Sequence, residues 1–277
     1  MKFGVTMFMT DQTIGPAELA REIEARGLHS LYVPEHTHIP TSRRTPPATG
    51  DAELPEEYKR TLDPFVALAM AAAVTERLVV GTGICLVAQR DPILTAKAVA
   101  TLDRESGGRF VFGVGFGWNA DEIEAHGVDM KRRRDIAREH MLAMKALWTE
   151  EVASFEGEFV HLAPSWSWPK PAAGRPPVLI GGAAGPKLFA QVAEYADGWI
   201  PIGGAGVRAA MEDLARACAA RGRDPKTLSV VPFGTVPDPG KLEYYASIGI
   251  EEVVLRLPSG TRDRILPKLD ALAELGA

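Results

Sequence analysis

The chain has 277 residues, 46% of them hydrophobic and 24% charged, with a formal net charge of −5 and an isoelectric point near 5.8. A chain of this length buries about three quarters of the surface that its unfolded form exposes, so the composition excludes intrinsic disorder. Since affinity for nucleic acid depends mainly on neutralising phosphates with basic residues, the acidic balance predicts no DNA or RNA partner.

Neither a membrane segment nor an export signal is predicted. The longest apolar run, Val66 to Val74, is far shorter than the roughly 20 residues that cross a bilayer. The sequence begins MKFGVTMFMT, with one lysine followed by residues typical of a strand rather than of a secretion signal. The two cysteines, Cys85 and Cys218, form no metal-binding motif and fit a reducing compartment. We therefore expect a cytoplasmic protein.

Short runs of β-branched and aromatic residues alternate with amphipathic stretches that are long enough for helices. The runs begin near Phe3, Ser30, Leu78, Phe110, Pro177, Gly198, Leu228 and Glu252. Runs such as VLIGG and EEVVLRL are continuously apolar, as expected for a parallel sheet covered by helices. The alternation predicts eight strand–helix units.

Characteristic residues mark the ends of the predicted helices. Five helices should begin where a capping residue precedes a proline, because the fixed φ of proline suits the first helical position. These pairs are Gly15-Pro16, Asp63-Pro64, Asp91-Pro92, Gly185-Pro186 and Asp238-Pro239. Left-handed glycines are expected after four helices, at Gly27, Gly107, Gly222 and Gly249. Eight such units close into a (β/α)8 TIM barrel, which we expect to occupy residues 1–277 as a single domain.

Two connections are longer than a barrel usually needs. Residues 37–61, after the second strand, are rich in Pro, Thr and charge, and we expect them to form a lid over the active site. Residues 151–175, after the fourth helix, contain FEGEFVHL, whose central glycine predicts a β-hairpin. Trp166 and Trp168 in this segment, together with Trp118, are candidates either for the apolar wall of a pocket or for ordinary packing.

Function in such barrels gathers at the carboxyl ends of the strands, and the second strand ends in Glu35-His36-Thr37-His38. His36 directly follows the strand and titrates near neutral pH, so we expect it to face the barrel mouth; a polar surface loop is the alternative. The His-x-His pattern also occurs in metal sites, but the remaining histidines do not lie at strand ends. We therefore predict no metal.

Glycines interrupt the next two strands. Gly81 and Gly83 lie in the third strand, where they predict either close backbone approach by a ligand or a kink made for packing. Gly113, Gly115 and Gly117 lie at the end of the fourth strand, without the flanking order of a dinucleotide-binding unit. We interpret this run as a flat backbone surface against which a planar ring lies.

The fifth strand ends in VLIGGAAGPKL, where Gly181 to Gly185 lead into a helix that begins with proline. Backbone N–H groups at such a helix start suit a phosphate; a tight strand–helix turn is the alternative. A histidine, a glycine surface and an anion site at one barrel mouth together predict a planar, phosphorylated cofactor.

At these residues the sequence resembles the bacterial luciferase-like superfamily, and most closely its actinobacterial branch of oxidoreductases that use the deazaflavin coenzyme F420. The matching motifs lie between residues 28 and 200. They are the EH pair after the second strand, LDPFVALAMAAAVTERLVVGTGI, QRDPILTAKAVATLDRESGGRFVFGVGFGWN, and IGGAAGP followed by AEYADGW. The resemblance implies a (β/α)8 barrel with a ring-shaped cofactor at its mouth, in a homodimer.

The resemblance also implies roles for single positions. Glu35 and His36 match the acidic–histidine pair beside the reactive face of the ring, and Gly83-Ile84 matches a non-proline cis peptide bond that supports the ring. Two further segments match cofactor-binding loops. Gly115, Phe116, Gly117 and Asn119 match the loop along the ring and the cofactor's side chain, and Gly182, Ala183, Ala184 and Gly185 match the phosphate-binding turn.

One position departs from the pattern of the sugar-phosphate dehydrogenases in this family, which carry a glutamate as proton donor where this chain has Phe116. The resemblance therefore implies hydride transfer between F420 and another small organic substrate. His36 would act as general acid or base, and Glu35 would orient it or contact the cofactor. Three loop arginines are candidates for binding an anionic substrate or the acidic tail of the cofactor, with solvated loop positions as the alternative: Arg43, Arg44 and Arg90.

Other functions stay open at this point. A flavin monooxygenase that uses reduced FMN and oxygen would share the fold, because ring electronics rather than fold separate flavin from deazaflavin chemistry. The family also contains proteins that only bind a flavin or deazaflavin, although an intact His36 argues against that function. A metal-dependent hydrolase is the most distant alternative.

Overall fold

The computed structural model describes residues 1–41, 43–46, 53–202 and 206–276. The expected lid over residues 37–61 therefore lies partly outside the described residues. The strands are β1 (Lys2–Thr6), β2 (Ser30–Val33), β3 (Val79–Thr82), β4 (Cys85–Leu86), β5 (Phe110–Gly115), β6 (Ala153–Glu156), β7 (His161–Ser165), β8 (Val178–Gly181), β9 (Gly198–Ile200), β10 (Ser229–Val230), β11 (Phe233–Thr235) and β12 (Glu252–Arg256).

Helices lie between most of the successive strands of the described chain. The α-helices are α1 (Pro16–Ala25), α2 (Pro64–Ala72), α3 (Pro92–Glu105), α4 (Ala120–Ala125), α5 (Arg133–Thr149), α6 (Pro186–Tyr195), α7 (Val207–Ala219), α8 (Pro239–Ser247) and α9 (Arg262–Ala273). Short 3-10 helices are η1 (Glu56–Arg60), η2 (Val87–Gln89), η3 (Pro225–Thr227) and η4 (Glu274–Gly276). No helix in the described ranges is long and apolar enough to cross a membrane.

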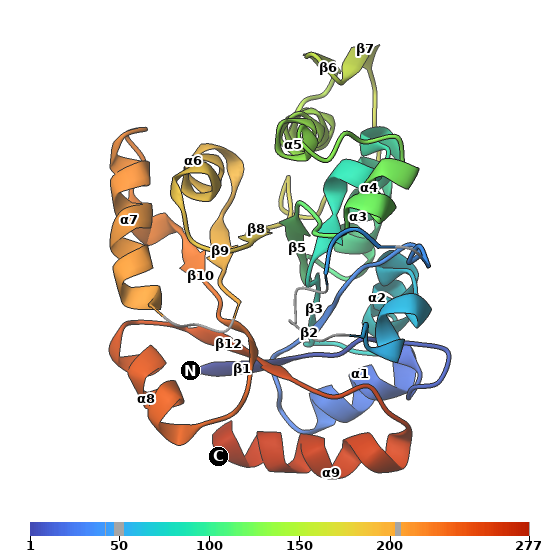
Figure 1. The fold of residues 1–277 in the computed structure, drawn as a ribbon, viewed down its shortest axis with the longest axis vertical. Helices are drawn as coiled ribbons and strands as arrows, with labels where there is room; N and C mark the ends of the chain where they lie inside the picture. The colour runs from blue at the N-terminus through green and yellow to red at the C-terminus, as the bar shows by residue number, and fades with distance from the viewer. Residues whose placement is uncertain (42, 47–52, 203–205, 277) are drawn as a thin grey trace.

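The main sheet is parallel and curls into a barrel surrounded by helices (Figure 1). Its strands are ordered β10-β9-β8-β5-β3-β2-β1-β12-β11, and β4 pairs with β5. The seventh unit closes the ring because it is divided into two short strands, of which β10 pairs with β9 and β11 pairs with β12. The predicted (β/α)8 barrel is therefore confirmed, with all eight expected strand regions in place.

The five prolines expected to start helices do so, at the first residues of α1, α2, α3, α6 and α8. Asp63 shows why: its carboxylate accepts hydrogen bonds from the backbone N–H groups of Phe65 and Val66, which have no partner inside the helix. The four glycines expected after helices all have φ between 67° and 81°. Local capping chemistry thus determines where these helices begin and end.

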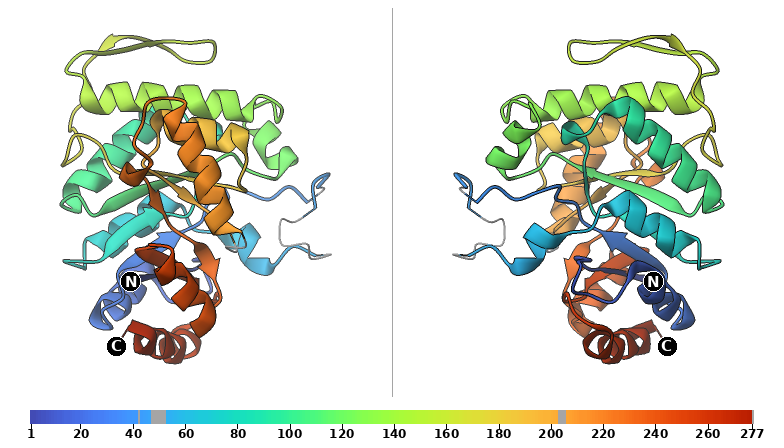
Figure 2. Two further views of the ribbon diagram at one scale, coloured as in Figure 1. Left: turned by 90° about the vertical axis from the view of Figure 1, so that its left-hand side faces the viewer. Right: turned by 90° about the vertical axis from the view of Figure 1, so that its right-hand side faces the viewer.

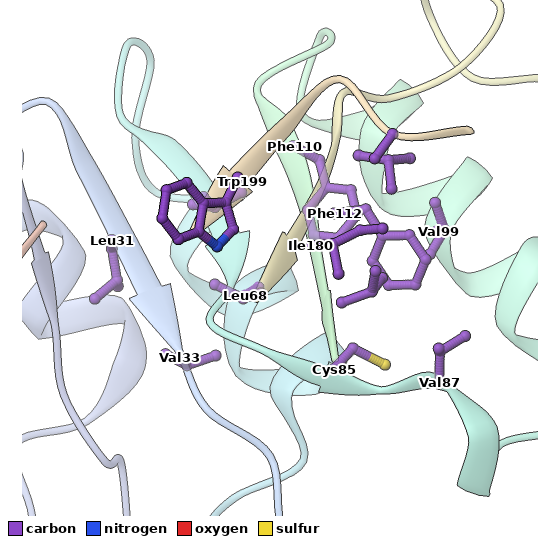
Figure 3. Packing of buried hydrophobic residues seen from close by; sticks show 14 of the residues in the cluster. Leu31, Val33, Leu68, Cys85, Val87, Val99, Phe110, Phe112, Ile180 and Trp199 are labelled. Carbon is purple, nitrogen blue, oxygen red and sulfur yellow. The ribbon is translucent and has the colours of Figure 1, made fainter. Parts of the chain in front are cut away.

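The core has two parts, one outside the barrel wall and one inside it. Outside, the rings of Phe110 and Phe112 of β5 pack with their centroids 6.0 Å apart (Figure 3). Phe112 also contacts Trp148 of α5, at 6.1 Å between ring centroids. A second cluster comes from strands all around the sheet, so its members meet only in the barrel interior: Tyr32, Leu179, Ile200, Val231 and Val254. This filled interior closes the floor beneath the carboxyl ends of the strands.

The predicted hairpin after the fourth helix unit is confirmed. Strands β6 and β7 pair antiparallel, and the Gly157 N–H donates to the Val160 carbonyl in the turn. The hairpin lies over the outer side of α5 (Figures 1 and 2). Trp166 and Trp168 follow it and are 76% and 61% exposed. They do not line the barrel mouth, so the expectation of a pocket wall is not met for these two residues.

Candidate functional site

A pocket of about 680 Å³ opens at the carboxyl ends of the barrel strands. Residues at or just after the ends of β1, β2, β3, β4, β5, β8, β9 and β12 line it, together with Phe233 and Gly234 of β11. Eight of the residues predicted for the site are among them: Glu35, His36, Gly83, Ile84, Gly115, Phe116, Gly117 and Gly182. The pocket thus lies where barrel enzymes place their chemistry.

His36 lies in the pocket wall with its side chain only 6% exposed. Its Nδ1 is 2.7 Å from Oε2 of Glu122, whose side chain is 1% exposed. The rings of Tyr58 and Trp118 lie 5.2 Å and 5.9 Å from the imidazole between centroids. These contacts hold the ring in one orientation, with one nitrogen bonded to a carboxylate.

Glu122 was not predicted from the sequence. It lies in the short helix α4, which follows the glycine run and begins after Asn119. Its Oε1 accepts hydrogen bonds from the backbone N–H of Thr37, at 3.2 Å, and from Nε2 of Gln89, at 3.4 Å. The available signal was an acidic residue shortly after the fourth strand, where barrel side chains reach the mouth, but sequence alone does not pair it with His36.

Both carboxylate oxygens of Glu35 are engaged by the protein. Oε2 accepts from the backbone N–H of Leu86 at 2.6 Å, and Oε1 accepts from Nε of Arg90 at 2.5 Å. Arg90 also donates to Asp63. Burial disfavours the charge on Arg90, but the Glu35 carboxylate outweighs it and raises the pKa of Arg90. Glu35 therefore links the end of β2, by hydrogen bonds, to the segment from Leu86 to Arg90 that follows β3.

The Gly83-Ile84 peptide bond is cis, as the resemblance implied. A Cβ atom at Gly83 would lie 2.2 Å from the ring of Phe233, and one at Gly115 would lie 2.4 Å from the side chain of Ile84. A Cβ at Gly181 would also meet Ile84, at 2.8 Å. A side chain at any of these positions would therefore force Phe233 or Ile84 to shift, so the glycines allow the present packing.

The glycine run, interpreted from the sequence as a flat backbone surface for a ring, also packs closely against neighbouring segments of the chain. A Cβ atom at Gly113 would lie 2.0 Å from the carbonyl oxygen of Thr82. A Cβ at Gly115 would lie 2.4 Å from the side chain of Ile84, and one at Gly117 would lie 2.8 Å from the side chain of Ile123. The space beside these glycines is filled by other residues of the chain. Gly115 and Gly117 still line the pocket, but the side chain of Ile84 covers the backbone between β5 and β8.

Four residues expected to bind the cofactor do not line the pocket. Asn119 is buried behind it, and neither Oδ1 nor Nδ2 has a hydrogen-bond partner among the described residues. Ala183 and Ala184 are exposed, and Gly185 is the residue before α6. Ala183, Ala184 and Gly185 follow Gly182, which lies at the edge of the pocket. The start of α6 is therefore open to a ligand that extends beyond the barrel mouth.

Two arginines at the start of α5 line the pocket, and neither was predicted. The Arg134 guanidinium lies 4.2 Å from the centroid of the Phe116 ring, and its buried Nη1 has no described hydrogen-bond partner. Burial lowers the pKa of both Arg133 and Arg134. Nε2 of Gln191 in α6 donates to the Arg134 carbonyl at 3.2 Å, so the first turn of α5 packs against the middle of α6. An unsatisfied buried guanidinium nitrogen suits an anionic ligand.

The arginines named from the sequence have other contacts. Arg44 is paired with Asp121 and Glu124, and Arg90 with Glu35 and Asp63. Neither they nor Arg43 line the pocket. A different arginine, Arg256 at the end of β12, reaches it instead. The cations of the pocket thus come from α5 and β12 rather than from the loop after β2.

Comparison with known proteins gives one family match and a full-length relative. The model of the family described as luciferase-like monooxygenase matches residues 11–237. The uncharacterized protein Rv0953c of Mycobacterium tuberculosis is 45% identical over 276 residues, which covers 99% of this chain and 98% of the relative. Similarity on this scale extends over the pocket-lining segments as well as the barrel.

Solved structures share the whole fold at low sequence identity. The monooxygenase RslO1 from Streptomyces bottropensis has a TM-score of 0.77 and 21% identity, covering 99% of this chain and 98% of that one. The coenzyme F420-dependent tetrahydromethanopterin reductase from Methanopyrus kandleri has a TM-score of 0.73 and 16% identity, covering 99% and 97%. These similarities show that the chain shares its barrel fold with these proteins.

Proposed function

The chain belongs to the luciferase-like monooxygenase family, and we propose that it is an oxidoreductase that transfers a hydride between coenzyme F420 and a small organic substrate. The observation that carries the proposal is the composition of one pocket, which combines the buried His36–Glu122 pair with the unpartnered nitrogen of Arg134. The first is suited to proton transfer and the second to an anion. The F420-dependent reductase that shares the fold supports this choice of cofactor.

The described residues fit a phosphorylated, ring-shaped cofactor. A phosphate would be held at the first turn of α5, where Arg134 offers an unsatisfied N–H group and Gly182 lines the same pocket. The ring would lie over Ile84 and beside Phe116, both in the pocket wall. The buried amide of Asn119, which lacks a described partner, is available to the cofactor's side chain if this loop adjusts.

When bound, the deazaflavin donates or accepts the hydride. In the direction of alcohol oxidation, His36 takes the hydroxyl proton on its ring while the carbon is oxidised to a carbonyl; in reduction it returns that proton to the oxygen. Tyr58 and Trp118 flank the imidazole and reduce the access of water to it. Glu35 is bonded to Leu86 and Arg90, so we assign it a positioning role.

An assay without oxygen tests this function. The protein is incubated with oxidised F420 and a panel of small secondary alcohols, and with reduced F420 and the matching ketones. We expect a change in the absorbance of the deazaflavin with at least one pair. Activity only with reduced FMN and oxygen, measured as oxygen consumption, would contradict the proposal and support the monooxygenase alternative. Binding of either cofactor without any turnover would support a binding protein.

We expect Arg134→Met to weaken F420 binding by roughly 10- to 100-fold, because one charge-assisted hydrogen bond to a phosphate is worth about 1.5 to 3 kcal/mol. A deazaflavin that lacks the phosphate should bind equally well to the wild type and to Arg134→Met. The measurement is a fluorescence titration with each ligand.

Arg138→Met is the matched control for this variant. Arg138 lies on the same helix but is paired with Glu194, outside the pocket. Its substitution should leave both affinities within a few-fold of the wild type. An equal loss of affinity for the two deazaflavins in Arg134→Met would show that Arg134 supports the ring or the fold instead of the phosphate.

We also propose that the protein is a homodimer formed through α2 and α3. These neighbouring helices expose four large apolar side chains, Val66, Met70, Ile93 and Leu94. Clustered exposed apolar side chains are typical of an interface. Leu94→Glu should shift the protein from dimer to monomer in sedimentation equilibrium, whereas Val152→Glu, at an exposed apolar position before β6, should not. A monomeric wild type would refute this assignment.

A further inference from the structure

We infer that Glu122 is a positioning residue that fixes the proton of neutral His36 on Nδ1 and so leaves Nε2 as the proton acceptor of the pocket. The inference deepens the proposed function, since it names the atom that would exchange a proton with the substrate. It begins from the 2.7 Å contact between Nδ1 and Oε2 of Glu122.

The contacts of Glu122 suit an ionised carboxylate. Two further donors point at its other oxygen, the backbone N–H of Thr37 and the amide Nε2 of Gln89. An ionised carboxylate only accepts hydrogen bonds, so Nδ1 of His36 must be the donor in this pair. A neutral imidazole carries one proton, and with that proton on Nδ1 the opposite nitrogen has a free lone pair.

The second nitrogen of His36 is available to a ligand. No described residue makes a hydrogen bond with Nε2, and His36 belongs to the pocket wall. Trp118 and Tyr58, whose rings also contact each other, pack against the imidazole and restrict its rotation. A ring flip would also place a carbon next to the Glu122 carboxylate and lose the only bond that pairs the two side chains.

The arrangement makes His36 a base when it is neutral and an acid when it is protonated. In alcohol oxidation the C–H bond would lose its hydride to the oxidised deazaflavin while the O–H bond breaks and its proton bonds to Nε2. The resulting imidazolium is stabilised by the adjacent carboxylate of Glu122. In the reverse direction the N–H bond at Nε2 breaks and the proton passes to the substrate oxygen as the hydride adds to carbon. A carboxylate that holds a catalytic imidazole in one tautomer serves the same purpose in serine proteases.

The tautomer is measured directly, by NMR on the cofactor-free protein labelled with 15N-histidine. His36→Gln identifies the His36 ring signals among those of the six histidines. At a pH where His36 is neutral, we expect the proton on Nδ1 in the wild type. In Glu122→Gln the side chain is isosteric but carries N–H donors, so we expect part or all of the population to carry the proton on Nε2. A wild-type proton on Nε2 overturns the inference, even if the variant does not fold.

Turnover provides the second readout. Glu122→Gln should lower kcat by roughly 10- to 100-fold, because Nε2 of His36 would no longer be held as the proton acceptor. KM and F420 affinity should stay within a few-fold, because the groups that bind substrate and cofactor are retained. Glu122→Asp should recover part of kcat, since it restores a carboxylate. Equal kcat in wild type and Glu122→Gln would overturn the positioning role.

The matched control is Glu124→Gln, two residues along the same helix. Glu124 is paired with Arg44 and lies outside the pocket, so its substitution should change neither the His36 tautomer nor kcat. The two readouts also separate the inference from the function on which it rests. A wild type with the expected tautomer but no activity with F420 would contradict the proposed function alone.

Discussion

His36→Ala is expected to lower kcat by roughly 10² to 10⁴, the range associated with loss of a positioned general acid or base. The imidazole is the titratable side chain of the pocket wall that keeps one nitrogen free while a buried carboxylate holds the other. Glu35 is fully engaged with Leu86 and Arg90, so it is not placed to replace His36. Removal of the imidazole leaves the proposed phosphate site at the first turn of α5 intact. F420 affinity should therefore stay within a few-fold of the wild-type value.

Steady-state kinetics and a cofactor titration on the same preparation check this prediction. His38→Ala is the matched control, because His38 is exposed, contacts Thr37 and His126, and does not line the pocket. It should have nearly wild-type kcat. Unchanged kcat in His36→Ala would reduce this histidine to a wall residue and would move proton transfer to solvent or to the substrate itself.

Glu35→Ala is expected to lower the free energy of unfolding by about 3 kcal/mol, since breaking one side of a buried ion pair leaves the other charge without compensation. The Glu35 side chain is 1% exposed, and its loss also leaves the Leu86 N–H without its acceptor. The effect falls at the lower end of the usual range for buried pairs because Asp63 continues to pair with Arg90.

Urea denaturation of the cofactor-free protein measures this change as a lower midpoint at an unchanged slope. Glu18→Ala serves for comparison, because Glu18 forms an exposed ion pair with Arg262 that should contribute less than about 1 kcal/mol. Equal midpoints for Glu35→Ala and wild type would show that Glu35 is not needed to hold the strand ends together, and would return it to a direct role in the pocket.

The sequence was sufficient for the barrel because the information is local. A proline after an aspartate or glycine starts a helix regardless of what lies across the molecule, as at Asp63, where the side chain caps its own helix. Strand positions followed from short apolar runs for the same reason. The pocket location then followed from the rule that barrel sites lie at the carboxyl ends of strands.

The partners of the site residues were harder to predict, because they depend on contacts between distant segments. Glu122 is 86 residues from His36, and nothing near Glu122 in the sequence distinguishes it from Glu124, which pairs with a surface arginine. The glycine run was interpreted as a flat backbone surface, and the sequence did not show that residues from two other segments, Thr82 with Ile84 and Ile123, pack against it. Arg134 belongs to a basic cluster in which only the fold shows which side chain turns toward the pocket.

Direct titration of the purified protein with F420 and with FMN, at one ionic strength, tests the central claim of a deazaflavin-dependent oxidoreductase. Both cofactors carry a phosphate and a planar tricyclic ring, so the comparison isolates preference for the ring system and the cofactor's side chain. We predict a lower dissociation constant for F420 than for FMN, measured from the change in fluorescence. An equal or lower dissociation constant for FMN would contradict the claim and favour an FMN-dependent monooxygenase with the same barrel.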